Sequence, residues 1–163
     1  MNTPVLNTGK LTLVGLLDED FVNYKVPSMT IMFPYCSFKC GENICQNSPL
    51  VREKTISIDI EALCDRYVNN KISEALVCQG LEPLDSFDEL IILIRCLRKR
   101  CDDYIVIYTG YEKQEIEEQI RELSQYKNII IKYGRFFSNQ KTHYDEILGV
   151  NLSSDNQYAE IIS

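Results

Sequence analysis

Short apolar runs alternate with amphipathic segments along most of the chain. Four of these runs predict buried strands, because they are short and mainly apolar. They are residues 29–33, 74–78, 104–108 and 128–133. Residues 10–17 predict a first strand or edge ribbon, and residues 157–162 predict a last short strand.

Helical periodicity fills the intervals between the central strands. Asp59 is placed to cap a first helix, whose apolar face follows the i, i+3, i+4 pattern at Ile60, Leu63, Cys64, Tyr67 and Val68. Ser86 and Glu89 have the spacing of a capping box, so a second helix with a broad apolar stripe is predicted from there to about Arg100. A third helix is predicted after Tyr111, with one apolar face at Ile116, Ile120 and Leu123.

Strands that alternate with helices predict the α/β class and a mostly parallel sheet, here in a single compact domain over residues 1–163. Ligands bind such sheets at the carboxyl ends of the strands. Three stretches each follow a predicted strand closely: Pro34–Leu50, Gly80–Leu84 and Thr109–Tyr111. We therefore expect them to converge on one site.

Composition and charge restrict the classes of partner and location. The 163 residues carry a net charge of −7, which disfavours nucleic acid as a partner because phosphate contacts need a basic face. The basic group Arg95, Arg98, Lys99 and Arg100 falls at the end of a predicted helix, where it complements the helix dipole. No run of apolar residues has the length of a membrane span, and the first ten residues do not read as a signal peptide. We expect a cytoplasmic protein that binds no membrane.

Three of the seven cysteines, Cys36, Cys40 and Cys45, fall in the one loop after the strand at residues 29–33. Thiolates suit iron–sulfur clusters, zinc or Cu(I). The spacing C-x3-C-x4-C lacks the paired knuckles of structural zinc and offers no evident fourth ligand, so it favours a four-iron cluster with one open iron over zinc or unliganded thiols.

The cysteines and the histidine outside this loop are weaker candidates for metal ligands. Cys64 is interpreted as a small buried apolar residue on the first helix. Cys78, Cys96 and Cys101 fall in or at the ends of predicted elements, and the one histidine, His143, is interpreted as a surface residue.

Several short segments occur in an order that is similar to a known family. They are Phe21–Tyr24, the cysteine loop with Cys45-Gln46-Asn47, Gly80-Leu81-Glu82-Pro83-Leu84, Tyr108-Thr109-Gly110-Tyr111, Gly134-Arg135-Phe136, and Ser154-Asp155-Asn156-Gln157. Together they span nearly the whole chain. The chain resembles the compact radical S-adenosylmethionine enzymes, in particular the activating proteins of anaerobic ribonucleotide reductases.

Two positions depart from the family pattern. The family spacing is C-x3-C-x2-C, whereas four residues precede Cys45 here, and Ile44 stands where the family has an aromatic residue that contacts adenine. Leu81 replaces the second glycine of the family's Gly-Gly-Glu-Pro stretch.

The resemblance implies a partial (β/α) barrel of the radical S-adenosylmethionine type with two cofactors. It assigns the [4Fe-4S] cluster to Cys36, Cys40 and Cys45, with no catalytic residue beyond these ligands. S-adenosylmethionine would contact Gly80, Leu81, Glu82, Tyr108, Thr109 and Asn156. Tyr111 and Gln157 are further candidates. Read without the resemblance, Glu82 is an ordinary turn residue, the tyrosines are packing residues, and Asn156 and Gln157 belong to a turn.

The resemblance also implies a reaction. A reduced cluster cleaves S-adenosylmethionine to a 5′-deoxyadenosyl radical, which abstracts hydrogen and installs a glycyl radical on a partner similar to an anaerobic ribonucleotide reductase. A flavodoxin- or ferredoxin-like protein would donate the electron. Two alternatives stay open: a radical enzyme that acts on another peptide or a small molecule, and a non-catalytic iron–sulfur or zinc module.

Overall fold

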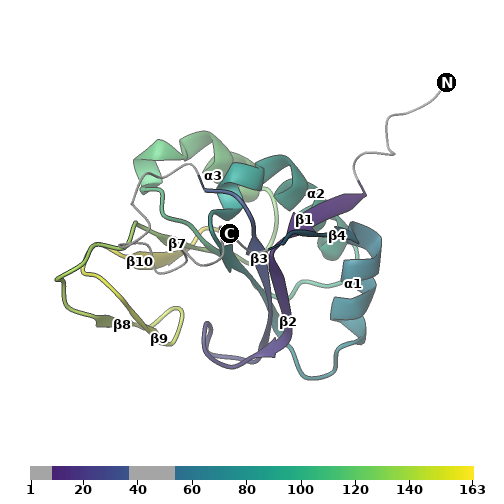
Figure 1. Cartoon of the computed structure of the whole chain (residues 1–163), viewed down its shortest axis with the longest axis horizontal. Coiled ribbons are helices and arrows are strands. Elements are labelled where there is room, and N and C mark those ends of the chain that lie inside the picture. The colour runs from purple at the N-terminus through teal and green to yellow at the C-terminus, as the bar shows by residue number, and fades with distance from the viewer. Residues whose placement is uncertain (1–8, 37–53) are drawn as a thin grey trace.

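A computed structural model describes residues 9–36 and 54–163, and its centre is a six-stranded sheet (Figure 1). In sheet order the strands are β10 (Tyr158–Ile161), β7 (Ile129–Tyr133), β6 (Ile105–Tyr108), β5 (Ala75–Gly80), β3 (Ser28–Phe33) and β2 (Gly15–Asp20). The four inner strands are parallel, and the edge strands β10 and β2 are antiparallel to their neighbours. The predicted α/β class with a mostly parallel sheet is confirmed. Over the described residues the sheet is open, with β10 and β2 at its edges.

Helices and two small ribbons surround this sheet. The helices are α1 (Ile60–Asn69), α2 (Phe87–Arg98) and α3 (Glu117–Leu123), with 3₁₀ turns η3 (Pro83–Ser86) and η4 (Lys113–Glu115). The ribbons pair β1 (Lys10–Leu13) with β4 (Ile56–Asp59), and β8 (His143–Asp145) with β9 (Val150–Leu152). None of the helices in the described part of the chain has the length and apolar character needed to cross a bilayer.

The helix starts test two predicted caps. Asp59 caps α1 as predicted, since its side chain accepts a hydrogen bond from the Ala62 amide at 3.0 Å. The prediction of a capping box at α2 is wrong, because the Ser86 side chain makes no capping hydrogen bond. Glu89 Oε1 instead accepts from the Thr12 amide at 2.7 Å, which ties α2 to β1.

The two faces of the sheet are covered differently (Figure 1). One face packs against the helices through large apolar side chains such as Phe33, Ile107 and Ile131. The other face packs against the β8–β9 hairpin region, where Leu148 and Leu152 meet Val77. Because side chains alternate along a strand, each inner strand contributes to both layers.

The first predicted strand is wrong in one respect. Residues 10–17 form two strands in different sheets, with β1 paired to β4 and β2 paired to β3. At the break, the Val14 amide donates to the Met32 carbonyl at 2.8 Å. A Cβ on Gly15 would lie 2.9 Å from Met32 Sδ, so the chain passes too close to Met32 there for a side chain to fit without a shift. The strand β4 and the β8–β9 hairpin are elements that the apolar pattern did not predict.

Candidate functional site

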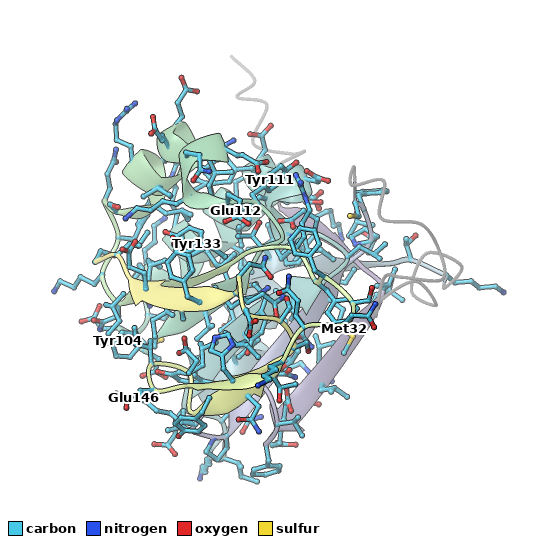
Figure 2. The ribbon with its side chains drawn as sticks, turned by 90° about the vertical axis from the view of Figure 1, so that its left-hand side faces the viewer. Met32, Tyr104, Tyr111, Glu112, Tyr133 and Glu146 are labelled. Atoms are coloured by element: carbon cyan, nitrogen blue, oxygen red, sulfur yellow. The ribbon has the colours of Figure 1, made fainter. Side chains whose placement is uncertain are left out.

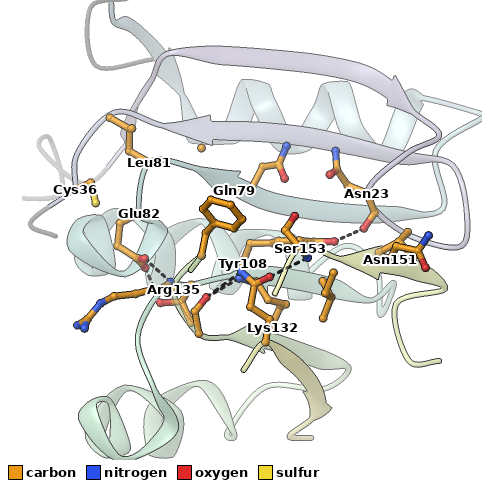
Figure 3. A pocket seen from close by; sticks show the side chains of 18 of the residues that line it. Asn23, Cys36, Gln79, Leu81, Glu82, Tyr108, Lys132, Arg135, Asn151 and Ser153 are labelled. Atoms are coloured by element: carbon orange, nitrogen blue, oxygen red, sulfur yellow. Dashed lines mark hydrogen bonds between the residues drawn. The ribbon is translucent and has the colours of Figure 1, made fainter. Parts of the chain in front are cut away.

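A pocket of about 340 Å³ lies at the carboxyl ends of the parallel strands. Its lining comes from residues 22–23, 36, 79–82, 108–110, 132, 134–136, 150–153 and 157 (Figure 3). The ends of β3, β5, β6 and β7 therefore all contribute to it. The predicted convergence of the cysteine loop, the Gly80 stretch and the Thr109 stretch is seen for their described residues.

Cys36 is the one predicted cluster ligand within the described residues, and it lies on the pocket wall, three residues after β3. Cys40 and Cys45 lie outside the described residues. Within residues 9–36 and 54–163 no group of three His, Cys, Asp or Glu side chains is arranged to hold a metal ion. A metal centre with three such ligands would therefore include at least one residue outside residues 9–36 and 54–163.

Gly80 brings the end of β5 against the end of β3. Its φ of +102° suits glycine, and an added Cβ would lie 2.5 Å from the Phe33 amide nitrogen. Phe33 and Gly80 are also register partners, and the Leu81 amide donates to the Phe33 carbonyl at 3.0 Å. The stretch that leads to Glu82 is thereby joined to the stretch that leads to Cys36.

Glu82 is a buried carboxylate whose position is fixed by three hydrogen bonds. Its side chain is almost fully buried, and it accepts from Thr109 Oγ1 at 2.7 Å, from the Gly110 amide at 2.8 Å and from the Leu84 amide at 3.1 Å. Burial raises the pKa of Glu82 to about 7, although these hydrogen bonds favour its ionised form. A cation bound beside it would favour ionisation further.

Thr109 and Tyr108 have different places at the end of β6. Thr109 is buried and helps to position Glu82. Its hydroxyl donates to the Glu82 carboxylate and accepts from the Tyr111 amide at 3.0 Å. Tyr108 lines the pocket and donates to the Asn23 carbonyl at 2.5 Å. Tyr111 is outside the pocket lining, and its hydroxyl donates to Asp85 at 2.6 Å. Figure 2 shows Tyr111 far from Tyr104, which precedes the other end of β6.

The segment at Val22 and Asn23 forms a wall of the pocket and is held by Asp20. The Asp20 carboxylate accepts from Thr30 Oγ1 at 2.6 Å, Asn23 Nδ2 at 2.5 Å and the Val22 amide at 2.8 Å. Burial alone would raise the pKa of Asp20, but these hydrogen bonds outweigh it and leave the pKa below its ordinary value. Asp20 is thus an ionised anchor for this wall.

The C-terminal turn closes another side of the pocket. Asn156 is not among the lining residues. Its side-chain Nδ2 donates to the Arg135 carbonyl at 2.8 Å, and its Oδ1 accepts from Ser154 Oγ at 2.7 Å. Gln157 does line the pocket, and it donates to the Gly134 carbonyl at 3.2 Å. The ligand contact predicted for Asn156 therefore remains a prediction, while the turn interpretation of its side chain agrees with these bonds. His143 lies in β8 and is also outside the lining.

Lys132, on β7, is a pocket residue that the sequence did not single out. Its side chain is buried, its Nζ donates to the Gly134 carbonyl at 2.9 Å, and it lies 5.7 Å from the centre of the Tyr108 ring. Burial lowers the pKa of Lys132 to about 8, and the charges of Glu82 and Glu112 partly oppose this shift. The available signal was a single lysine within the apolar run of β7. Gln79 and Arg135 also line the pocket and were not predicted to bind.

Three of the four cysteines outside the loop are core residues. Cys64 and Cys96 lie in the core between α1 and α2, and Cys78 is buried in β5. Burial raises the pKa of each of these thiols. The interpretation of Cys64 as a buried apolar residue is confirmed.

Comparison with known proteins bears on the same segment. A model of the 4Fe-4S single cluster domain family matches residues 27–158, which is most of the chain. The chain therefore belongs to this family, and a 4Fe-4S cluster is the metal centre that this membership supports. The matched segment includes Cys36, Cys40 and Cys45. No curated protein and no solved structure matches the chain.

Proposed function

We propose that this member of the 4Fe-4S single cluster domain family is a radical S-adenosylmethionine enzyme that activates a glycyl-radical partner. The observation that carries the proposal is that Cys36, the Gly80–Glu82 stretch and the Tyr108–Gly110 stretch line one pocket. These are the segments on which the resemblance to the activating proteins rests. The parallel topology brings the strand ends to one edge of the sheet, and the order of these segments along the chain adds the resemblance to that geometry.

The cluster would be held by the thiolates of Cys36, Cys40 and Cys45. Three thiolates leave one iron of a four-iron cluster without a protein ligand, and such an iron can bind an amino-acid group directly. When bound, the cluster supplies one electron for cleavage of the sulfonium bond of S-adenosylmethionine. Cys36 lies on the pocket wall, so a ligand in this pocket would lie beside the cluster.

Glu82 would bind the ammonium group of the ligand's methionine part. Its carboxylate is positioned before the ligand arrives, because Thr109, Gly110 and Leu84 already donate to it. Approach of an ammonium group lowers the pKa of about 7, so Glu82 binds as the carboxylate. Leu81 also lines the pocket, and its side chain would contact the ligand where the family has a glycine.

The test is formation of 5′-deoxyadenosine by anaerobically reconstituted protein with dithionite and S-adenosylmethionine. Glu82→Gln should lower product formation about 10-fold or more, since hydrogen bonds to charged groups contribute roughly 1.5–3 kcal/mol. Glu118→Gln, at an exposed position on α3, is the matched control and should leave the rate unchanged. Absence of 5′-deoxyadenosine from protein with a fully loaded cluster would refute the enzymatic proposal.

The partner is tested separately. Electron paramagnetic resonance with a candidate anaerobic reductase should detect a glycyl radical after incubation with the reduced protein and S-adenosylmethionine. Product formation without such a radical would favour another peptide or a small molecule as substrate. Metal analysis that finds one zinc and no iron in anaerobically purified protein would favour the non-catalytic module.

A further inference from the structure

Another cavity lies at the opposite end of the sheet from the pocket described above. Its volume is about 470 Å³, and its lining comes from residues 24–26, 74, 104, 130, 146–147 and 161. Glu74 and Tyr104 directly precede β5 and β6, so the cavity lies at the amino ends of the parallel strands. Figure 2 shows Tyr104 and Glu146 at the same end of the molecule, away from Tyr111. Among the described residues the two cavities share none of their lining.

The turn between β8 and β9 forms one wall of this cavity. Glu146 and Ile147 belong to that turn, and the sheet contributes Ile130 of β7. Gly149 in the same turn has a φ of +71°, and an added Cβ there would lie 2.6 Å from Lys25 Cβ. The turn is therefore packed closely against the segment that leads into β3, and the cavity lies between these two segments and the sheet.

Tyr24 presents an unused hydroxyl to this cavity. The residue is 4 % exposed and lines the cavity, yet among the described residues its hydroxyl forms no hydrogen bond. Burial raises the pKa of Tyr24, and the nearby Tyr104 raises it further, so the hydroxyl stays protonated and uncharged. A buried hydroxyl without a partner is unfavourable to the fold, and phenylalanine would pack there without that cost. Something that enters the cavity would explain the hydroxyl.

The charges around the cavity favour a cation as that occupant. Glu74 and Glu146 both line it, and among the described residues neither carboxylate forms a hydrogen bond or an ion pair. The opposing charge is Lys25, whose Nζ lies 5.9 Å from the centre of the Tyr24 ring. Two carboxylates against one ammonium give the described lining a net negative charge.

The rest of the lining is apolar or aromatic. It consists of Tyr24, Val26, Tyr104, Ile130, Ile147 and Ile161. A volume of this size, with an apolar wall and a few polar groups, is typical of a small-molecule site. Tyrosine rings and carboxylates together also suit an organic ammonium, because a ring face attracts a cation.

We propose that this cavity binds a small organic cation, whose ammonium group contacts Glu74, Glu146 and the Tyr24 hydroxyl while its apolar body lies against the isoleucines. Hydrogen bonds from an ammonium to carboxylates are charge-assisted and therefore strong. The inference goes beyond the proposed function and does not rest on it, since the two cavities share no described residue.

The test compares three probes of similar size and different charge. They are 2-(4-fluorophenyl)ethylamine, 2-(4-fluorophenyl)ethanol and 3-(4-fluorophenyl)propanoate, and ligand-observed fluorine NMR measures their binding to the anaerobic, cluster-loaded protein at neutral pH. The amine should bind about 5- to 50-fold more tightly than the alcohol, since it alone makes charge-assisted hydrogen bonds. The propanoate should bind more weakly than the alcohol, because both carboxylates repel it.

Substitutions in the lining assign the roles of its residues. Tyr24→Phe, Glu74→Gln and Glu146→Gln should each weaken binding of the amine about 3- to 10-fold. Lys25→Gln should instead strengthen it about 2-fold, because this change removes a like charge. Tyr144→Phe, at an exposed position of β8 outside the lining, is the matched control for Tyr24→Phe and should leave the affinity unchanged.

Two controls concern the place of binding and the fold. If Glu82→Gln abolishes binding of the amine while Glu146→Gln does not, the probe occupies the pocket at the carboxyl ends of the strands, and the inference is wrong. Tyr24→Phe should leave the midpoint of thermal unfolding unchanged or raise it, because the hydroxyl forms no hydrogen bond among the described residues. A clear decrease would make this hydroxyl a structural group and would also overturn the inference.

The remaining outcomes are equally decisive. Equal affinities for the three probes, or no binding of the amine at millimolar concentration, would mean that the cavity holds only water. Formation of 5′-deoxyadenosine is measured separately and is unaffected by either result. Failure of this inference therefore leaves the proposed function standing, and failure of the proposed function leaves the amine site to be judged by its own titrations.

Discussion

The same strands contribute to both faces of the central sheet, and the two faces bury different kinds of side chain. On β7, Ile129 and Ile131 point into the helix-covered core, whereas Ile130 and Lys132 belong to the face that carries the pocket. The helix-covered layer is formed by large apolar side chains that bury one another. The pocket side buries the ionisable groups Asp20, Glu82 and Lys132.

This difference separates what stabilises the fold from what prepares the site. Burial of apolar area stabilises the protein in proportion to the area removed from water. A buried charge is unfavourable unless hydrogen bonds or a ligand offset its desolvation. Substitutions at adjacent residues of one strand should therefore change the free energy of unfolding in opposite directions.

Ile131→Ala should have the largest effect on stability. Ile131 is fully buried in the helix-covered core, and truncation of such a side chain costs roughly 2–5 kcal/mol of the free energy of unfolding. Denaturant titration of the anaerobic, cluster-loaded protein measures the change. A cost below about 1 kcal/mol would mean that this layer is not the stabilising one.

Glu82→Gln should remove a pH dependence of stability. The folded protein holds the Glu82 proton up to a pKa of about 7, against 4.5 for an ordinary glutamate. Stability from this group is therefore complete below pH 4.5 and is lost as the pH rises toward 7. Between pH 5.5 and pH 7.5 the wild-type protein should lose about 2 kcal/mol relative to Glu82→Gln. If the free energy of unfolding depends on pH in the same way in both proteins, the raised pKa of Glu82 is contradicted.

Lys132→Met should increase the free energy of unfolding of the ligand-free protein by about 1–2 kcal/mol at neutral pH. The pKa of about 8 means that the fold disfavours the ammonium form, and loss of the bond to Gly134 offsets part of the gain. Because this pKa is lowered, the wild-type protein should regain stability as the pH rises from 8 toward 10.5. The difference in the free energy of unfolding between Lys132→Met and the wild-type protein should therefore shrink from pH 8 to pH 10.5. A difference that stays constant over this range would point to packing instead of charge.

Thr30→Val should have the smallest effect of the four. It removes the Thr30 hydrogen bond to Asp20 and should cost roughly 1 kcal/mol, because the remaining bonds from Asn23 and Val22 still hold the carboxylate. Thr12→Val is a control on β1, where the hydrogen bond to Glu89 comes from the Thr12 amide and survives the change. Equal costs for the two variants would argue against Asp20 as the anchor of the pocket wall.

The central part of the fold was predictable from the sequence because its strands are continuous apolar runs. Met29–Phe33 and Tyr104–Tyr108 match β3 and β6 within one residue at each end. The β8–β9 hairpin was not predictable, since its strands have three residues each and are largely polar on the exposed side. At Ser86 the local pattern of a capping box was overridden by a tertiary bond, because Glu89 is used by β1.

The site was predictable where a motif ends a strand, and less so elsewhere. Gly80 to Glu82 and Tyr108 follow central strands, so the parallel topology alone brings them to one edge. Whether a side chain near that edge faces the pocket or the interior of a turn depends on local geometry. For this reason Gln157 lines the pocket while its neighbour Asn156 does not, and Lys132 emerged only from the alternation along β7.

The contact at Gly80 links two parts of the site mechanically. Because Phe33 pairs with Gly80 in the sheet and its carbonyl accepts from the Leu81 amide, backbone pairing joins the ends of β3 and β5. This pairing holds the strand end that leads to Cys36 beside the turn that carries Glu82. The spacing between the root of the cysteine segment and this carboxylate is therefore set by the backbone of the folded chain and does not wait for a ligand to impose it.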